Sequence, residues 1–153
     1  MVEVITAKKK HAEQLAPKLR DIDVREIKVA NPDSSIKELL KLCITTSSES
    51  WAIVDDKSCI ALFGVRDMEN NSGIPWMLSS PEFFTKYYRR FIKETPDWLD
   101  KIWGTKTYLF NYISKDNSTS IKWLTKLGFN IHKEKTITFH DEIFYYFDFI
   151  KGH

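Results

Sequence analysis

The sequence predicts a mixed α/β (α+β) fold, in which about six to seven strands form one sheet with helices on both faces. Segments with helical spacing alternate with short apolar runs, in the order strand, helices, three strands, helix, strand, helix, strand, strand. Consecutive strands at both flanks of this order indicate hairpins, so the sheet should be mixed rather than wholly parallel. A length of 153 residues suits a single core, and we expect one domain over residues 1–153.

The first part of the chain predicts one strand followed by helices. Residues 2–6 alternate as a strand, and helical spacing runs from Lys8 to about Arg20. Pro17 lies inside that pattern and is expected to kink or shorten the helix. A short helix should occupy residues 21–29, and the segment from Asn31 to Asp33 predicts the start of the next helix.

Three strands follow in the middle of the chain. Residues 51–54 and 59–65 are apolar runs joined by a compact polar turn, which is typical of a hairpin. Residues 67–73 are polar and rich in turn-forming residues, so we expect a loop there. Residues 74–78 should form another short strand.

The clearest helix start comes directly after this strand. Ser79 is expected to cap the helix, with Pro81 in the first turn and Glu82 three residues after the serine, which is a capping-box pattern. The predicted apolar face of this helix consists of Phe83, Phe84, Tyr87, Tyr88, Phe91 and Ile92. The opposite, basic face consists of Lys86, Arg89, Arg90 and Lys93. A second short helix is expected around residues 98–103.

A short amphipathic helix closed by a glycine stands near the end of the chain. Asn117 or Ser118 supplies a polar side chain at its start, and Gly128 sits where a helix needs a left-handed residue. Its apolar stripe consists of Ile121, Trp123, Leu124 and Leu127. Strands are expected at residues 107–113, 129–135 and 143–150. The first of these is apolar enough to predict that both of its faces are covered.

The composition is that of an ordinary globular domain and disfavours several classes of function. A formal net charge of +2 is too small to predict nucleic-acid binding. No apolar run approaches the roughly 20 residues that a membrane helix needs, and no signal-peptide pattern opens the chain, so we expect no secretion by that route. Cys43 and Cys59 are interpreted as reduced, buried thiols. No metal site is predicted, because residues 140–142 fit a turn better than a ligand cluster.

Two sets of motifs resemble known families. The segment from Asn117 to Phe129 resembles the Asn-x-x-Ala-x-x-x-Tyr-x-x-x-Gly-Phe segment of GNAT-superfamily N-acetyltransferases, and the predicted element order is that of the GNAT fold. A narrower succession, made of residues 60–65, 75–79, 111–117 and 123–129, resembles a phage family of GNAT-like proteins that includes internal virion protein A of short-tailed phages. This resemblance implies phage virion or assembly proteins as partners, and a location in the host cytoplasm and in the virion.

The GNAT resemblance implies acetyl-CoA as the cofactor if the protein is an enzyme; the sequence alone assigns none. Members of that superfamily hold the pyrophosphate with a glycine-rich turn after the fourth strand, where backbone amides and a helix N-terminus face the phosphates. The matching segment here has no glycine, Pro81 lacks an amide hydrogen, and Glu82 adds negative charge. Ser79 and Ser80 are the candidate cofactor-binding residues in its place. Asn117 matches a family asparagine that can contact the CoA arm, although a helix N-cap is an equally good interpretation.

No catalytic residue is identified from the sequence. Leu124 stands at the position of the tyrosine that protonates the departing thiolate in many GNAT enzymes, and leucine has no proton to donate. A carboxylate base is not visible in residues 74–80. Trp76 and Asn111 are candidates for the substrate cleft, where the middle strands separate in this fold. Core packing of Trp76 and a structural hydrogen bond of Asn111 are the alternatives.

Three functions are carried forward from the sequence. The leading hypothesis is a phage GNAT-like protein with a degenerate acetyl-CoA site, which acts as a virion-associated or assembly protein. The alternative is an active acetyl-CoA-dependent N-acyltransferase on an unknown amine. The third is an antagonist of a host protein that uses the basic helix face.

Overall fold

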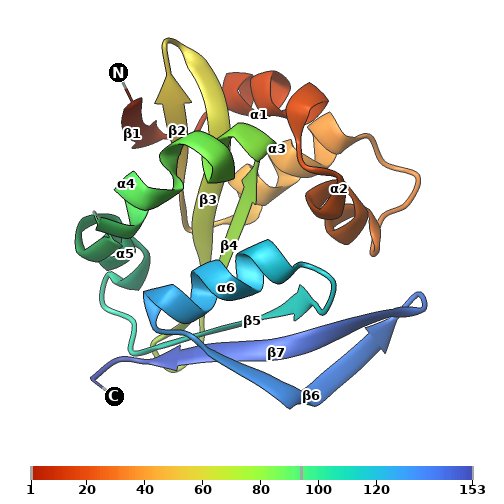
Figure 1. Ribbon diagram of the computed structural model, residues 1–153, viewed down its shortest axis with the longest axis vertical. Helices are drawn as coiled ribbons and strands as arrows, with labels where there is room; N and C mark the ends of the chain where they lie inside the picture. The colour runs from red at the N-terminus through yellow and green to blue at the C-terminus, as the bar shows by residue number, and fades with distance from the viewer. Residues whose placement is uncertain (1, 94, 153) are drawn as a thin grey trace.

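The computed structural model describes residues 2–93 and 95–152, with the backbone alone for residues 95–98. It contains one sheet with helices on both faces (Figure 1). The strands are β1 (Val2–Thr6), β2 (Glu49–Asp55), β3 (Ser58–Met68), β4 (Ser72–Ser79), β5 (Tyr108–Ser114), β6 (Asn130–Phe139) and β7 (Glu142–Ile150). The helices are α1 (Lys9–Leu15), α2 (Asp21–Lys28), α3 (Ile36–Thr46), α4 (Tyr88–Lys93), α5 (Thr95–Trp103) and α6 (Ser118–Leu127), with a 3₁₀ turn at Ala16–Lys18 and a π-helical turn at Phe83–Tyr87. None of the helices in these ranges is long and apolar enough to cross a membrane.

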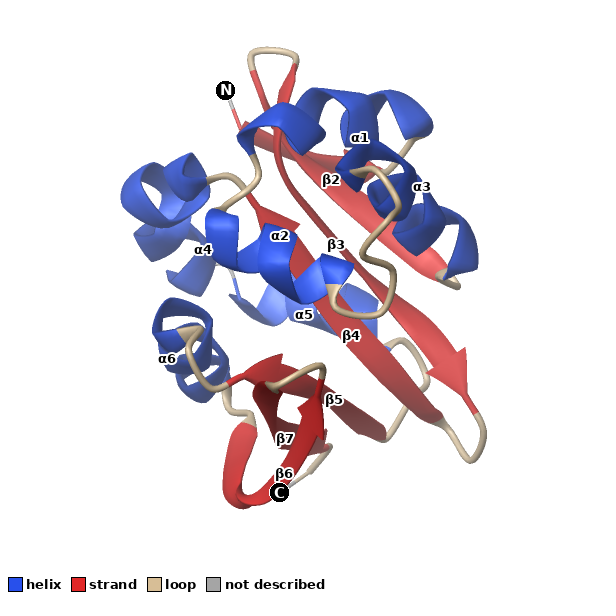
Figure 2. Ribbon diagram, turned by 90° about the vertical axis from the view of Figure 1, so that its right-hand side faces the viewer, coloured by secondary structure: helices blue, strands red, loops and turns tan. Residues whose placement is uncertain are grey.

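The sheet is mixed, as the sequence predicts. Its strands lie in the order β1-β2-β3-β4-β5-β7-β6, with β4 and β5 parallel and every other neighbouring pair antiparallel. The β2–β3 and β6–β7 pairs are the two predicted hairpins. A view at right angles shows β5, β6 and β7 turned away from the direction of β3 and β4 (Figure 2). The sheet therefore has two halves that meet at the β4–β5 pair.

Helices cover the sheet through two separate hydrophobic cores. The first core packs α1 and α3 on one face and includes Ala12, Leu15, Leu40, Ala52, Leu62 and Leu78. The second core packs the segment from the π-helical turn to α6 on the other face and includes Phe63, Phe83, Phe91, Leu109, Trp123 and Phe147. β3 serves both cores, and residues 59–65 are all buried, which explains the nearly continuous apolar run in that part of the sequence.

The β4–β5 pair is short, and this positions the site. The two parallel strands are paired only at Ser72 with Tyr108 and at Gly73 with Leu109. Beyond these pairs the ladder between them stops, while β4 continues to Ser79 and β5 to Ser114. The separating strand ends leave space in the middle of the sheet, between the two cores.

The helix start predicted at Asn31 to Asp33 is wrong. α3 begins at Ile36, because the hydroxyl of Ser35 accepts the amide hydrogen of Glu38 at 3.2 Å and caps the helix there.

The capping box predicted at Ser79 is also wrong. Ser79 still belongs to β4, its hydroxyl oxygen is buried without a hydrogen-bond partner, and helical structure begins only at residue 81. The hydroxyl of Ser80 donates to the carbonyl of Ile60, on the neighbouring strand β3, instead of capping the helix. Hydrogen bonds to Asp23 and to Ile60 have therefore taken up the Ser79 amide and the Ser80 hydroxyl, which the sequence pattern assigned to the helix start.

The first predicted strand of the C-terminal half is partly open to solvent. β5 forms where it is expected, but Tyr112 is 42% exposed, and Tyr108 and Phe110 on the same side of the strand are only half-buried. The expectation that both faces of this strand are covered was therefore wrong for the face that carries Tyr112.

The ends of α6 are formed as the sequence predicts. The side chain of Asn117 accepts the amide hydrogen of Ser120 at 3.3 Å, which makes it the N-cap. Gly128 has a φ of 107°, a left-handed conformation that favours glycine, and the ring of Phe149 lies 3.0 Å from where a Cβ would stand. α6 is thus fixed at both ends by residues that can be recognised in the sequence.

Candidate functional site

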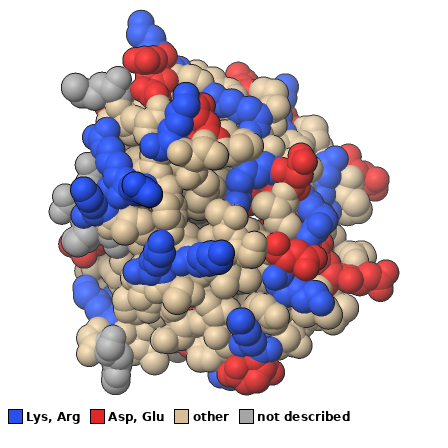
Figure 3. All heavy atoms as spheres, in the orientation of Figure 1, with Lys and Arg blue, Asp and Glu red and all other residues tan. Residues whose placement is uncertain are grey.

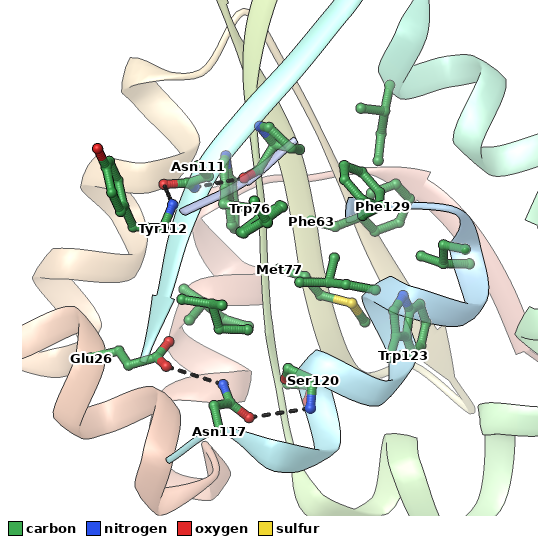
Figure 4. Close-up of a pocket in the computed structure, with 18 of the residues that line it drawn as sticks. Glu26, Phe63, Trp76, Met77, Asn111, Tyr112, Asn117, Ser120, Trp123 and Phe129 are labelled. Carbon is green, nitrogen blue, oxygen red and sulfur yellow. Dashed lines mark hydrogen bonds between the residues drawn. The ribbon is translucent and has the colours of Figure 1, made fainter. Parts of the chain in front are cut away.

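A cavity of about 300 Å³ lies where β4 and β5 separate. Residues of both cores line it, because it occupies the gap in the sheet between them. Most of the lining is apolar, including Phe63, Met77, Ile102, Trp123, Leu127 and Phe129. In Figure 4 Glu26, Asn117 and Ser120 gather at one end of the cavity, whereas Phe63 and Phe129 lie at the other. The cavity therefore has one polar end.

The end of β4 is tied to the N-terminal part of the chain. The amide of Ser79 donates to Oδ2 of Asp23 at 3.0 Å, and the carbonyl of Ser79 accepts the amide hydrogen of Arg20 at 2.9 Å. The amide of Ser80 donates to the carbonyl of Ile60 at 2.9 Å. The backbone amides that end β4 are therefore already used inside the protein.

Arg20 and Asp23 form a buried ion pair at this point. Two guanidinium nitrogens of Arg20 bind the two carboxylate oxygens of Asp23, at 3.0 and 2.9 Å, and the Asp23 side chain is only 1% exposed. Such two-point pairing is strong and directional. Burial raises the pKa of Asp23 from its ordinary value, while the hydrogen bonds from Arg20 and from the Ser79 amide act in the opposite direction. We call this arrangement the Arg20–Asp23 clasp.

The clasp reaches across the mouth of the cavity to α6. The guanidinium of Arg20 also donates to the hydroxyl of Ser120 at 2.9 Å and lies 4.5 Å from the centre of the Phe84 ring. Phe84 lines both the cavity and a second hollow on the outer surface between α4 and α6. Arg20 and Phe84 therefore lie between the outer surface and the interior of the cavity.

Glu26 supplies the acidic group at the polar end of the cavity. Its Oε1 accepts hydrogen bonds from Nδ2 of Asn117 (Figure 4) and from the amide of Ser114, both at 3.1 Å. Burial is the main reason that the pKa of Glu26 rises to about 7, and the nearby negative charge of Asp23 also raises it. A carboxyl group that changes its charge near neutral pH therefore faces the cleft.

The sequence-predicted residues fall into two groups. Ser79, Asn117, Trp76 and Asn111 line the cavity, whereas the hydroxyl of Ser80 is bound to β3. Asn117 is buried and combines two structural roles, since its oxygen caps α6 and its nitrogen binds Glu26. Ser79 is the predicted residue with an unused buried hydroxyl.

Asn111 and Trp76 are both held by hydrogen bonds. Nδ2 of Asn111 donates to the carbonyl of Pro75 at 2.8 Å, which bridges β5 and β4 just where their ladder has stopped. Nε1 of Trp76 donates to the hydroxyl of Ser47 at 2.7 Å, and the ring packs against the core of α1 and α3. Their side chains shape the wall of the cavity while their polar atoms are satisfied by the protein.

Three residues of the polar end were missed by sequence reasoning. Arg20, the N-cap residue of α2, and Asp23 and Glu26 within the helix are spaced by three, so they share one side of it. That side also carries Ile27, which lines the cavity, and a charged row beside a core residue is the signal that was available. No sequence rule indicated that this side would face the end of β4 rather than water.

The polar groups at the end of β4 do not fit a pyrophosphate. The amides of Ser79 and Ser80 already donate to protein oxygens, Pro81 has no amide hydrogen, and the Asp23 carboxylate adds negative charge at the same place. Leu124 lines the cavity at the position where many GNAT enzymes use a tyrosine, and it provides no proton. Within the part of the chain that the structure describes, no group of three His, Cys, Asp or Glu residues is arranged to hold a metal ion.

Solved structures with the same arrangement are GNAT acetyltransferases. The acetyltransferase (GNAT family) from Bacillus anthracis has a TM-score of 0.71 at 11% identity, covering 99% of this chain and 96% of that chain. Spermidine N-acetyltransferase from Vibrio cholerae, solved with CoA and spermine, has a TM-score of 0.70 at 13% identity, covering 98% and 95%. A GCN5-related N-acetyltransferase from Kribbella flavida has a TM-score of 0.69 at 15% identity, covering 97% of both chains. The chain therefore has the GNAT fold.

A second comparison concerns the sequence itself. A family model described as "Bacteriophage T7, probable scaffold protein Gp13" matches residues 70–136. The matched range begins in the turn before β4 and ends within β6, so it includes the end of β4 and all of α6. No curated protein matches the chain. Together with the fold, the match supports a phage GNAT-like protein.

Proposed function

We propose that this phage GNAT-like protein has a degenerate acetyl-CoA site and acts as a virion-associated or assembly protein through protein contacts. The Arg20–Asp23 clasp is the observation that carries the proposal. A carboxylate of the chain itself accepts the amide hydrogen at the end of β4, at the place where the family pattern puts its phosphate-binding turn. Binding of a pyrophosphate there would have to displace a buried ion pair, and breaking such a pair costs on the order of 3–5 kcal/mol.

The position of Arg20 at the mouth of the cavity supports the same proposal. Arg20 is bound to Asp23 and Ser120 at once and lies over Phe84, so it connects both sides of the cavity mouth. The match of residues 70–136 to a phage scaffold family supports a role in phage assembly or in the particle. Phage virion or assembly proteins are therefore the proposed partners, and the host cytoplasm and the virion the proposed locations.

One observation favours the alternative, an acetyl-CoA-dependent N-acyltransferase. Glu26 faces the cavity with a pKa raised to about 7, so it can take up a proton from an amine near neutral pH. Sequence reasoning found no such carboxylate. If this alternative holds, acetyl transfer to some amine must be measurable, and Glu26→Gln must lower it most above about pH 7, where the carboxylate is ionised.

Two experiments test the proposed function. The purified chain is incubated with acetyl-CoA and a panel of polyamines, aminoglycosides and peptides, and products are measured by mass spectrometry; no acetylated product above the protein-free control is expected. A tagged chain produced during phage infection is expected to sediment with particles or assembly intermediates. Acetylated product would overturn the degenerate site, and a tagged chain wholly absent from the sedimented fraction would overturn the virion or assembly role.

A further inference from the structure

A groove on the outer surface joins aromatic and basic side chains from two helical segments. A hollow of about 240 Å³ is lined by Phe84 of the π-helical turn, by Tyr88 at the start of α4, and by Thr119, Lys122 and Lys126 of α6. We call it the α4–α6 groove. The sequence alone separated the aromatic and basic residues of the α4 segment onto opposite faces. The fold brings basic residues of another helix to its aromatic side.

The aromatic floor of the groove is held firmly in place. The ring of Tyr88 lies 5.6 Å from that of Trp123 and 6.0 Å from that of Phe84, and the Phe84 ring contacts the guanidinium of Arg20. The Arg20–Asp23 clasp therefore contacts the Phe84 ring of the groove from the inner side of the protein. A rigid aromatic surface loses little conformational freedom on binding, which favours its use as an anchor site.

The rim of the groove and the surface beside it are positive. Lys122 and Lys126 are exposed on α6, and Lys126 Nζ stands 5.2 Å from the centre of the Tyr88 ring. Lys and Arg side chains also gather over the neighbouring α4, on the same face of the molecule (Figure 3). The exposed basic residues of the α4 segment include Lys86, Arg89 and Lys93, and Glu82 forms an ion pair with Lys86 at 3.1 Å. These basic residues belong to the helical segment that carries Phe84 and Tyr88, so their positive charge adds to that of the groove rim.

From this juxtaposition we propose that the α4–α6 groove is the docking site for an acidic segment of a partner protein that carries one bulky apolar side chain. The apolar side chain packs on Phe84 and Tyr88, and carboxylates on either side of it pair with Lys122 and Lys126. This proposal rests on the proposed function, because it names the surface through which a phage assembly protein makes its protein contacts.

Two features favour a protein segment over other anionic ligands. The hollow, at about 240 Å³, is below the roughly 300–1,000 Å³ of usual small-molecule pockets, and one anchoring side chain suits it better. The net charge of +2 also gives little general attraction to nucleic acid.

The test uses a fluorescent synthetic peptide of about twelve residues, rich in Glu and Asp with one central Trp. Fluorescence anisotropy on the full chain is expected to give a dissociation constant of about 10–100 µM that weakens as salt is raised. The double variant Lys122→Glu, Lys126→Glu is expected to bind at least about tenfold more weakly, and Tyr88→Ala about threefold more weakly. Lys115→Glu, Lys133→Glu makes the same change of charge at exposed positions away from the groove and should keep wild-type affinity.

Thermal unfolding of every variant separates lost binding from lost folding. The docking site would be overturned if the peptide did not bind the wild-type chain. It would also be overturned if the double variant in the groove and the control double variant weakened peptide binding equally. Equal affinity for a single-stranded oligonucleotide of the same charge would also overturn it, since the groove would then be a general polyanion surface. Acetyl-CoA is titrated separately, so its binding would refute the degenerate cleft without being confused with failure of the docking site.

Discussion

The two walls of the cleft differ in how closely they follow the pattern of the fold. On one side α6 begins at the Asn117 cap and ends at a left-handed Gly128, as the resemblance to acetyltransferases implies. On the other side the end of β4 has no glycine turn, and its amide hydrogens bond to Asp23 and Ile60. The α6 wall has the cap and the left-handed glycine that stabilise its helix. The β4 wall uses its backbone amides for contacts inside the protein.

The proposed function therefore requires that the helix-forming and the ligand-binding parts of a fold signature vary independently. Gly128 and Asn117 are required by helix geometry, whether or not a ligand binds. Backbone amides at the end of β4 are free to serve a ligand only if the protein leaves them unpaired. We therefore expect substitutions on the two walls to change the stability of the protein by different amounts.

The largest effect is expected from breaking the clasp. Asp23→Ala leaves the largely buried guanidinium of Arg20 without its carboxylate partner and the amide of Ser79 without its acceptor. We expect a loss of about 3–5 kcal/mol in the free energy of unfolding, measured by urea denaturation. Asp21→Ala, at an exposed position in the first turn of the same helix, should cost less than about 1 kcal/mol. Similar losses for the two variants would show that the clasp is not a structural centre.

A smaller effect, opposite in sign, is expected for Glu26→Gln. The pKa of Glu26 rises from 4.5 to about 7 on folding, so the folded chain binds this proton more tightly than the unfolded chain. Its contribution to stability is therefore fully present below pH 4.5 and is lost as the pH rises to about 7. Glutamine does not ionise, so the variant does not lose this stability. Its free energy of unfolding relative to the wild type should therefore rise by about 1–3 kcal/mol between pH 4.5 and pH 8. Urea denaturation across this range measures the difference; a constant difference would mean that Glu26 has an ordinary pKa.

On the α6 wall, Gly128→Ala tests the C-terminal end of the helix. The left-handed backbone at φ 107° and the Phe149 ring at 3.0 Å both oppose a Cβ, and we expect a loss of about 1–2 kcal/mol. Gly152 also has a positive φ, of 89°, but no atom lies within 4 Å of the place that a Cβ would take there. Gly152→Ala should therefore cost clearly less, and the difference in melting temperature between the two variants reports the contact with Phe149.

The smallest effect is expected at the other end of α6. Asn117→Ala removes the N-cap and one donor to Glu26, and should cost about 1 kcal/mol in the free energy of unfolding. Asn117→Ser can still cap the helix but cannot reach Glu26 as an amide does, so it should lose only part of that amount. Chemical denaturation at pH 8 compares them. An alanine variant as stable as the wild type would show that the cap contributes nothing here.

Much of the fold could be predicted because it follows from local periodicity. The seven strands, the mixed sheet and α6 with its caps came from alternation, helical spacing and turn residues. The capping box at Ser79 could not be recognised as wrong, because the competing hydrogen bonds come from Asp23 and Ile60, far away in the sequence. The charged row of Arg20, Asp23 and Glu26 was missed for the same reason. A helix with mixed charges is usually solvated, and only the tertiary structure shows that this side faces the end of β4.

Under the proposed function, Asp23 and Arg20 of the chain itself occupy the place where a cofactor phosphate would bind. Isothermal titration of acetyl-CoA into the wild-type chain, up to roughly millimolar ligand, tests it most directly. We predict no saturable heat of binding. A dissociation constant in the micromolar range would contradict the account, because it would mean that the cleft opens and holds the cofactor despite the clasp.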